Sequence, residues 1–285
     1  MAMILRAAIL LTWATVLAIH VVHHAAPGLG LVERRDPAVI VAAQLDRTLF
    51  YRIESGGAAL GTLSCSFQSK DARFQQELNV TLTPGTPWIE AARLAVLATG
   101  ISHPGRPNRP EPTGIGAVIE LSLDDRCRPC AVAISGLAFD LSFKADLVLD
   151  HRGVTGVVGF AGLRQAVAID LDPAALSGLE LTLALPPGVQ PGSAWTTKSL
   201  TVSGFSAKGP VLAAATTVHH ATAKETITTV AGPTSAVRVE STGAAGTAIA
   251  WIDQRGTVLR LDVPASGMSL VLQRVVTTDG TVAWP

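Results

Sequence analysis

The feature that most constrains the fold is a series of short apolar stretches between residues 115 and 185, separated by aspartate, glycine and proline. Apolar and polar side chains alternate through much of this series, which is typical of strands with one buried face. Asp, Gly and Pro favour turns through their side-chain hydrogen bonds or backbone geometry. The series predicts an antiparallel meander. Its expected strands are Ala117–Leu123, Ala131–Ser135, Ala138–Leu149, Val154–Phe160, Ala166–Leu171 and Leu179–Leu185.

The same pattern continues on both sides of this region. A first meander is predicted at Leu49–Ile53, Ala58–Gln68 and Arg73–Leu82. Later strands are predicted at Trp195–Ser203, Val211–Val218, Thr222–Val230, Ala236–Glu240, Thr247–Ile252, Thr257–Val263 and Met268–Thr277. A sheet with so many consecutive strands twists and curls. We therefore expect an all-β fold over 48–278, a large curved antiparallel sheet or open barrel.

One short helix interrupts the expected strands at 84–99. Thr86 can cap it and Pro87 suits its first position. The segment 101–116 that follows contains Pro104, Pro107 and two further prolines, so it is expected to be an exposed loop.

The amino-terminal stretch Ala7–Ala26 is almost unbroken apolar sequence. About 20 such residues are enough to cross a bilayer, and Arg6 before them favours a cytoplasmic amino terminus. We expect a transmembrane signal anchor at 1–27, a linker at 28–47 and a β domain at 48–285 outside the cytoplasm. A signal peptide cleaved near His24 is the alternative.

Composition excludes some classes of partner. The chain has 22 basic and 22 acidic residues and a formal net charge of +0, so it lacks the basic footprint of a nucleic-acid-binding protein. Aromatic residues make up 5% of the chain, which argues against a platform that stacks bases or sugars.

The sharpest local motif is Cys127-Arg-Pro-Cys130, placed in an expected turn between two strands. A redox pair of this spacing normally begins a helix, where the thiol pKa is lowered. A zinc site needs two more ligands, for which Cys65, His103 and His151 are candidates without supporting spacing. We favour a disulfide that closes the turn, with the metal and redox interpretations left open.

Other groups that can carry chemistry have simpler explanations. The vicinal pairs His23-His24 and His219-His220 suit surface histidines, because neighbours on a strand point to opposite faces and cannot chelate one ion. Ser206 and Lys208 lie in a sequence that lacks the nucleophile elbow of serine hydrolases. We expect no catalytic residue, no cofactor and no metal site.

Three segments carry a resemblance to known proteins. They are Tyr51–Gly61, Leu183–Trp195 and Trp251–Arg260, each built of strand ends and glycine or proline turns. In this order they resemble the strand-rich segments beside transglutaminase-like domains in bacterial envelope proteins. They are more distantly similar to the curved sheets of periplasmic lipoprotein carriers. The resemblance spans most of 48–278 and implies a fold without an activity, because the catalytic transglutaminase-like domain is absent.

From the apolar amino-terminal stretch we expect a single-pass protein of the bacterial inner membrane with a periplasmic main domain, in agreement with the resemblance to envelope proteins. We expect this domain to be non-catalytic and to hold an apolar ligand, such as a lipid or acyl chain, in its concave sheet. One alternative is an envelope scaffold or accessory subunit that binds a partner protein. A thiol-redox or metal protein using Cys127 and Cys130 is the other.

Overall fold

The structure is a computed structural model, and it describes residues 37–70, 73–83, 115–125, 127–138, 141–150, 153–160, 162–169, 183–206, 209–243 and 246–284. In this part of the chain no helix is both long and apolar enough to span a membrane. The predicted anchor at Ala7–Ala26 and the predicted helix at 84–99 lie outside the described residues and stay predictions.

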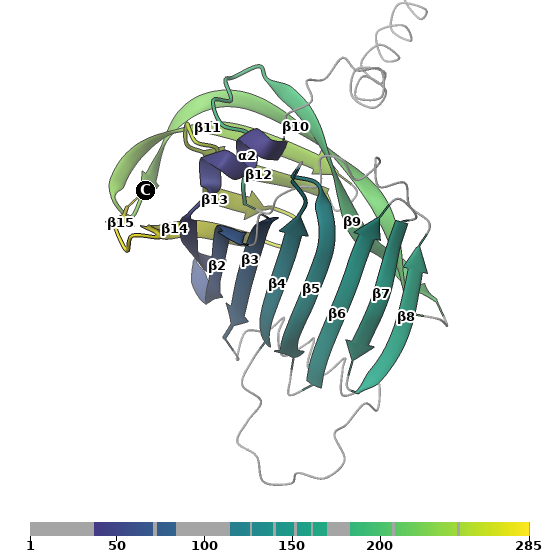
Figure 1. Cartoon of the computed structure of the whole chain (residues 1–285). Coiled ribbons are helices and arrows are strands. Elements are labelled where there is room, and N and C mark those ends of the chain that lie inside the picture. Colours follow the sequence, from purple (N-terminus) through teal and green to yellow (C-terminus); the bar gives the residue numbers. More distant parts are fainter. Residues whose placement is uncertain are drawn as a thin grey trace, which may run out of the picture.

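The described strands form one antiparallel sheet of 15 strands that curves strongly around its own interior (Figure 1). The prediction of an all-β fold with one large curved antiparallel sheet is confirmed. The strands are β1 Arg47–Ser55, β2 Ala58–Lys70, β3 Arg73–Leu82, β4 Ile115–Leu123, β5 Pro129–Ala138, β6 Leu141–Asp150, β7 Gly153–Phe160, β8 Leu163–Ile169, β9 Ala194–Ser206, β10 Gly209–Thr229, β11 Gly232–Gly243, β12 Gly246–Ile252, β13 Val258–Val263, β14 Met268–Thr277 and β15 Val282–Ala283.

Almost every strand pairs with its neighbours in sequence. The order runs from β8 back to β1, then from β14 back to β9, with β15 beside β14. The pairing of β1 with β14, in which Leu49 lies opposite Val275, joins two meanders in the middle of the sheet. The ends of this order are β8 and β9, so the sheet is not closed into a barrel.

A short helix, α2 (Pro37–Gln44), lies near the turn between β12 and β13, away from the edge strands β8 and β9 (Figure 1). Proline suits the first position of a helix because its missing N–H would have no partner there. Val41 packs into the core with 2% of its surface exposed. The side-chain amide of Gln44 donates a hydrogen bond of 2.9 Å to the carbonyl of Arg255. The sequence predicted only a linker here.

The segment 183–193 corrects one strand prediction. We predicted a strand at Leu179–Leu185, but its described part, 183–185, contains only an isolated bridge between Ala184 and Thr257. Leu183 has a positive φ of 64°, which a strand does not accommodate. Its apolar side chains are instead buried in the main core, where a short apolar run serves as well as in a strand.

The region 209–229 corrects a second strand prediction. We predicted two strands, Val211–Val218 and Thr222–Val230, but the chain forms the single strand β10 of 21 residues. A bulge between Ala221 and Ala223 shifts its pairing with β11. Ala221 also exchanges backbone hydrogen bonds with Gly192 and Ser193. The bulge therefore lies where the segment 183–193 leads into β9.

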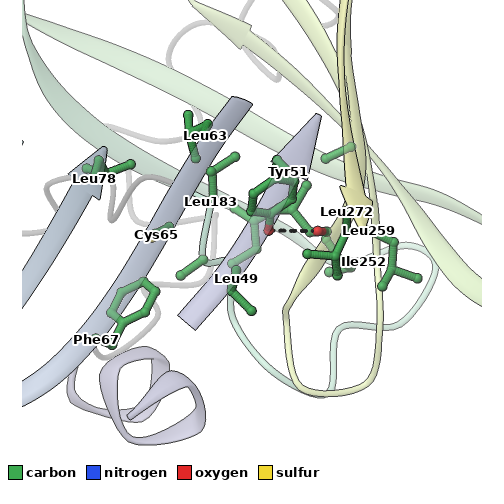
Figure 2. Packing of buried hydrophobic residues seen from close by; sticks show 14 of the residues in the cluster. Leu49, Tyr51, Leu63, Cys65, Phe67, Leu78, Leu183, Ile252, Leu259 and Leu272 are labelled. Atoms are coloured by element: carbon green, nitrogen blue, oxygen red, sulfur yellow. Dashed lines mark hydrogen bonds between the residues drawn. The ribbon is translucent and has the colours of Figure 1, made fainter. Parts of the chain in front are cut away.

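The main core lies where β1 to β3 face the segment 183–185 and strands β12 to β14 (Figure 2). Tyr51 is 1% exposed, and its hydroxyl donates a hydrogen bond of 2.9 Å to the carbonyl of Val258. This bond satisfies the one polar atom of an otherwise apolar ring. Desolvation holds the pKa of Tyr51 well above 10, so the ring stays neutral at physiological pH.

Candidate functional site

The two faces of the sheet differ in burial. On β6, Ala145, Leu147 and Leu149 are buried, whereas the alternating residues Lys144, Asp146 and Val148 are exposed. We call the face that carries Leu147 the inner face and the opposite face the outer face. The alternation follows from the two-residue period of a strand.

The register extends the inner face across the first meander and onto β14. One row of directly paired residues crosses eight strands from β7 to β14 without a polar side chain. It consists of Val158, Ala145, Ile134, Ile119, Leu78, Cys65, Leu49 and Val275. A continuous apolar surface of this length is the most extensive feature on which a function of the described residues can rest.

Packing divides this surface into two parts. Near β1 and β14 it is filled, because large side chains such as Tyr51, Phe67 and Trp195 are almost fully buried there. On β6 and β7 a second, separate cluster consists of Ala145, Leu147, Leu149 and Val154.

The second cluster is made of smaller groups than the first. Val132, Ile134 and Val158 are only partly buried against it. Gly156 on β7 adds no side chain, whereas the ring of Phe143 lies over Gly136. The inner face of β5 to β7, which we call the β5–β7 inner face, is therefore apolar, shallow in side-chain volume and partly accessible.

The Cys127–Cys130 turn is held by hydrogen bonds to Asp124 and contains no disulfide in the structure. The amide of Arg128 donates to Asp124 Oδ1 at 2.8 Å, and its guanidinium Nε donates to Oδ2 at 2.8 Å. Cys127 is buried with a positive φ of 54°, and the Cys130 thiol donates to the carbonyl of Ser122 at 3.4 Å. Both cysteines are thiols in the structure, so the disulfide stays a prediction for the oxidised protein.

We expect the double change Cys127→Ser and Cys130→Ser to lower stability by only about 1–2 kcal/mol, because the turn keeps its Asp124 hydrogen bonds and only one sulfur position is fully buried. Urea unfolding with and without a reductant measures this. If reduction alone lowered the stability of the wild type by about 3 kcal/mol or more, a bridge would be the main support of the turn.

Of the other candidate metal ligands, only Cys65 lies among the described residues. Cys65 is buried, and the Gln76 amide donates to its sulfur at 3.3 Å. Desolvation raises the pKa of Cys65 to about 12, which makes it an inert thiol. His103 and His151 lie outside the described residues. Among the described residues no three His, Cys, Asp or Glu side chains gather as metal ligands would.

The two neighbouring histidines lie on opposite faces of β10, as their positions on a strand predict. His220 is exposed, but His219 is fully buried, which corrects the prediction of two surface histidines. His219 Nε2 lies 2.8 Å from the Thr197 hydroxyl and Nδ1 lies 2.8 Å from the Ser241 hydroxyl. The Trp195 ring stacks on the imidazole with 5.0 Å between centroids.

This histidine cluster is built for a neutral imidazole. Burial lowers the pKa of His219 to about 4. A stacked indole favours an imidazolium, but the loss of solvation outweighs that attraction. Ser, His and Thr in a row resemble a proton relay, yet Ser241 is itself buried, with 8% of its surface exposed, so its hydroxyl is poorly placed for a substrate.

Sequence reasoning missed this cluster because its members lie on three different strands. Trp195 and Ser241 are placed opposite His219 by the pairings of β10 with β9 and β11. No local motif contains them. The alternation of β10 predicts that one histidine is buried and the other exposed. It does not predict which of the two is buried.

Comparisons with known proteins add little. No protein family matches the chain, and the curated proteins contain no match. A solved structure from Bacteroides fragilis, of a protein described as exported with a YmcC-like fold, shares 9% identity and a TM-score of 0.28, covering 81% of this chain and 96% of that one. A likeness this distant carries no argument, and the resemblance to segments beside transglutaminase-like domains stays a prediction.

Proposed function

We propose that the domain is a non-catalytic binding protein that holds an acyl chain or similar apolar ligand on the β5–β7 inner face. The observation that carries this proposal is the division of the inner face. Its part near β1 and β14 is filled by large side chains, whereas the part on β5 to β7 presents partly buried Val132, Ile134 and Val158. Apolar surface that remains accessible gains free energy when a ligand covers it.

The chemistry of this face suits an acyl chain better than a polar ligand. Its side chains are aliphatic apart from Phe143, whose ring lies over Gly136. The neighbouring charges of Lys144 and Asp146 point to the outer face and pair with each other at 3.0 Å. Strand β6 has 10 residues and spans roughly 30 Å, which is long enough for an extended hydrocarbon chain.

The test uses two neighbouring valines on β7 that differ only in the face they occupy. Val158 packs on the inner face, and Val157 is 41% exposed on the outer face. We expect the full-length protein to bind a fluorescent fatty acid saturably. Val158→Trp should weaken this binding by about tenfold or more by filling the site, and Val157→Trp should leave it unchanged.

Circular dichroism of both variants shows whether they are folded. Equal binding by the wild type and a folded Val158→Trp protein, or no saturable binding by the wild type, would refute the proposal. In that case a partner-binding scaffold becomes the favoured function. If Val158→Trp does not fold, Ile134→Phe provides a second obstruction of the same face.

A further inference from the structure

A pocket of about 620 Å³ lies beside α2, far along the chain from the β5–β7 inner face. It is open to solvent and includes residues from the end of α2, the start of β1, the turn between β12 and β13 and the end of β14. Its polar lining consists of Asp46, Arg47, Gln254, Arg255, Thr277, Thr278 and Asp279.

The guanidinium of Arg47 is held in this pocket by neutral groups. Its Nη1 donates to the Gln44 side-chain oxygen at 3.1 Å and to the Thr257 hydroxyl at 3.0 Å. Gln44 and Thr257 are both fully buried. Gln44 is fixed in turn by its bond to the Arg255 carbonyl. The Arg47 side chain is therefore oriented before any ligand arrives.

The remaining edge of this guanidinium has no partner among the described residues. A guanidinium carries five N–H donors, and the two hydrogen bonds of Arg47 both leave from Nη1. The Nε and Nη2 donors form the fork that binds a carboxylate or phosphate through two parallel hydrogen bonds. Desolvation lowers the pKa of Arg47, which an anion in the pocket would offset.

The charges around the pocket are balanced, so the case for an anion rests on the orientation of the Arg47 guanidinium. Arg255 lines the same pocket and repels Arg47 electrostatically, whereas the nearby carboxylate of Asp253 attracts it more strongly. The carboxylate of Asp253 accepts the amides of Arg255 and Thr257, each at 2.8 Å. Asp279 likewise accepts the Thr277 hydroxyl and the Thr281 amide within its own turn. Asp46 is exposed, and Asp46 and Asp279 are the two lining carboxylates, which balance the charges of Arg47 and Arg255.

We propose that this pocket is an oxyanion site, in which the Nε and Nη2 donors of Arg47 bind a phosphate or carboxylate group with help from Arg255. It is separate from the acyl-chain site in residues and in chemistry. The oxyanion can belong to a small soluble molecule or to the headgroup of an anionic lipid.

Calorimetric titration of the full-length protein with inorganic phosphate tests the proposal. We expect saturable binding that Arg47→Lys weakens about tenfold, because a lysine keeps the charge but loses the fork. Arg255→Ala should weaken binding and Asp46→Asn should strengthen it. The matched control is Arg274→Lys, because Arg274 stacks on Phe50, 4.4 Å from the ring centroid, and does not line the pocket.

Vesicles distinguish the two sources of the oxyanion. If the wild type favours phosphatidylglycerol over phosphatidylcholine vesicles more than Arg47→Lys does, and phosphate abolishes the difference, the ligand is a lipid headgroup. If phosphate binds but vesicle preference is the same for both proteins, the ligand is a soluble anion. Absence of saturable phosphate binding, or equal binding by folded Arg47→Lys, overturns the proposal. Arg255→Ala decides the matter if Arg47→Lys does not fold.

Discussion

Replacement of Gly61 by alanine should destabilise the protein by about 3 kcal/mol or more, whereas the same replacement at Gly116 should be nearly neutral. A Cβ atom at Gly61 would lie 2.0 Å from the carbonyl oxygen of Thr81 on β3. That oxygen belongs to the backbone, so it moves only if β2 and β3 separate. Gly61 sits where a bulge between Ile53 and Glu54 shifts the pairing of β1 with β2, as glycines at close strand approaches often do.

Gly116 is a close control because it lies on β4, directly opposite the same Thr81. The nearest atom to its Cβ position, the carbonyl oxygen of Val80, is 3.9 Å away. Urea unfolding of Gly61→Ala, Gly116→Ala and the wild type gives the comparison. Equal stability of the two variants would show that β3 can shift without cost and that the close approach at Gly61 does not require a glycine.

Acidification should remove about 3 kcal/mol of stability through His219 alone. Its pKa is about 4 in the folded protein and about 6.5 in the unfolded chain. Between these values the unfolded state binds a proton that the folded state does not. Stability from this residue is therefore complete above about pH 6.5 and is lost progressively as the pH falls to about 4.

Unfolding free energies measured from pH 7 to pH 4 should show this loss in the wild type. The control is His220→Gln, which changes the exposed neighbour on the other face and should leave the profile unchanged. His219→Gln should flatten the profile over the same range, whatever its effect on stability at pH 7. A steep profile that survives His219→Gln would assign the acid sensitivity to carboxylates instead.

Local alternation was enough to predict most of the sheet from the sequence. The bounds Arg73–Leu82 and Met268–Thr277 agree with β3 and β14, because each strand shows its period in its own residues. The prediction was wrong at 183–185, because these buried residues have the apolar composition of a strand but form only an isolated bridge. It was also incomplete at His219, whose burial depends on partners more than 20 residues away along the chain.

The candidate sites were still less visible in the sequence. The sequence predicted a concave apolar surface. It did not predict that one part of this surface is filled, because the filled part includes residues from distant segments, such as 183–185 and Trp195. The oxyanion site joins Arg47 to Thr257, which are 210 residues apart. No spacing rule links side chains at that distance in sequence, so only the assembled sheet brings them together.

The pairing of β1 with β14 has a consequence for how the protein is made. Strands β1 to β8 can pair with one another as they leave the ribosome, but β1 then keeps one bare edge until the last long strand has been synthesised. Closing this seam joins residues more than 200 positions apart, such as Arg47 and Thr277, and distant pairings form slowly. During elongation, β1 can therefore pair with wrong strands. A chain that ends before Met268 keeps β1 as an unpaired edge strand, which favours aggregation.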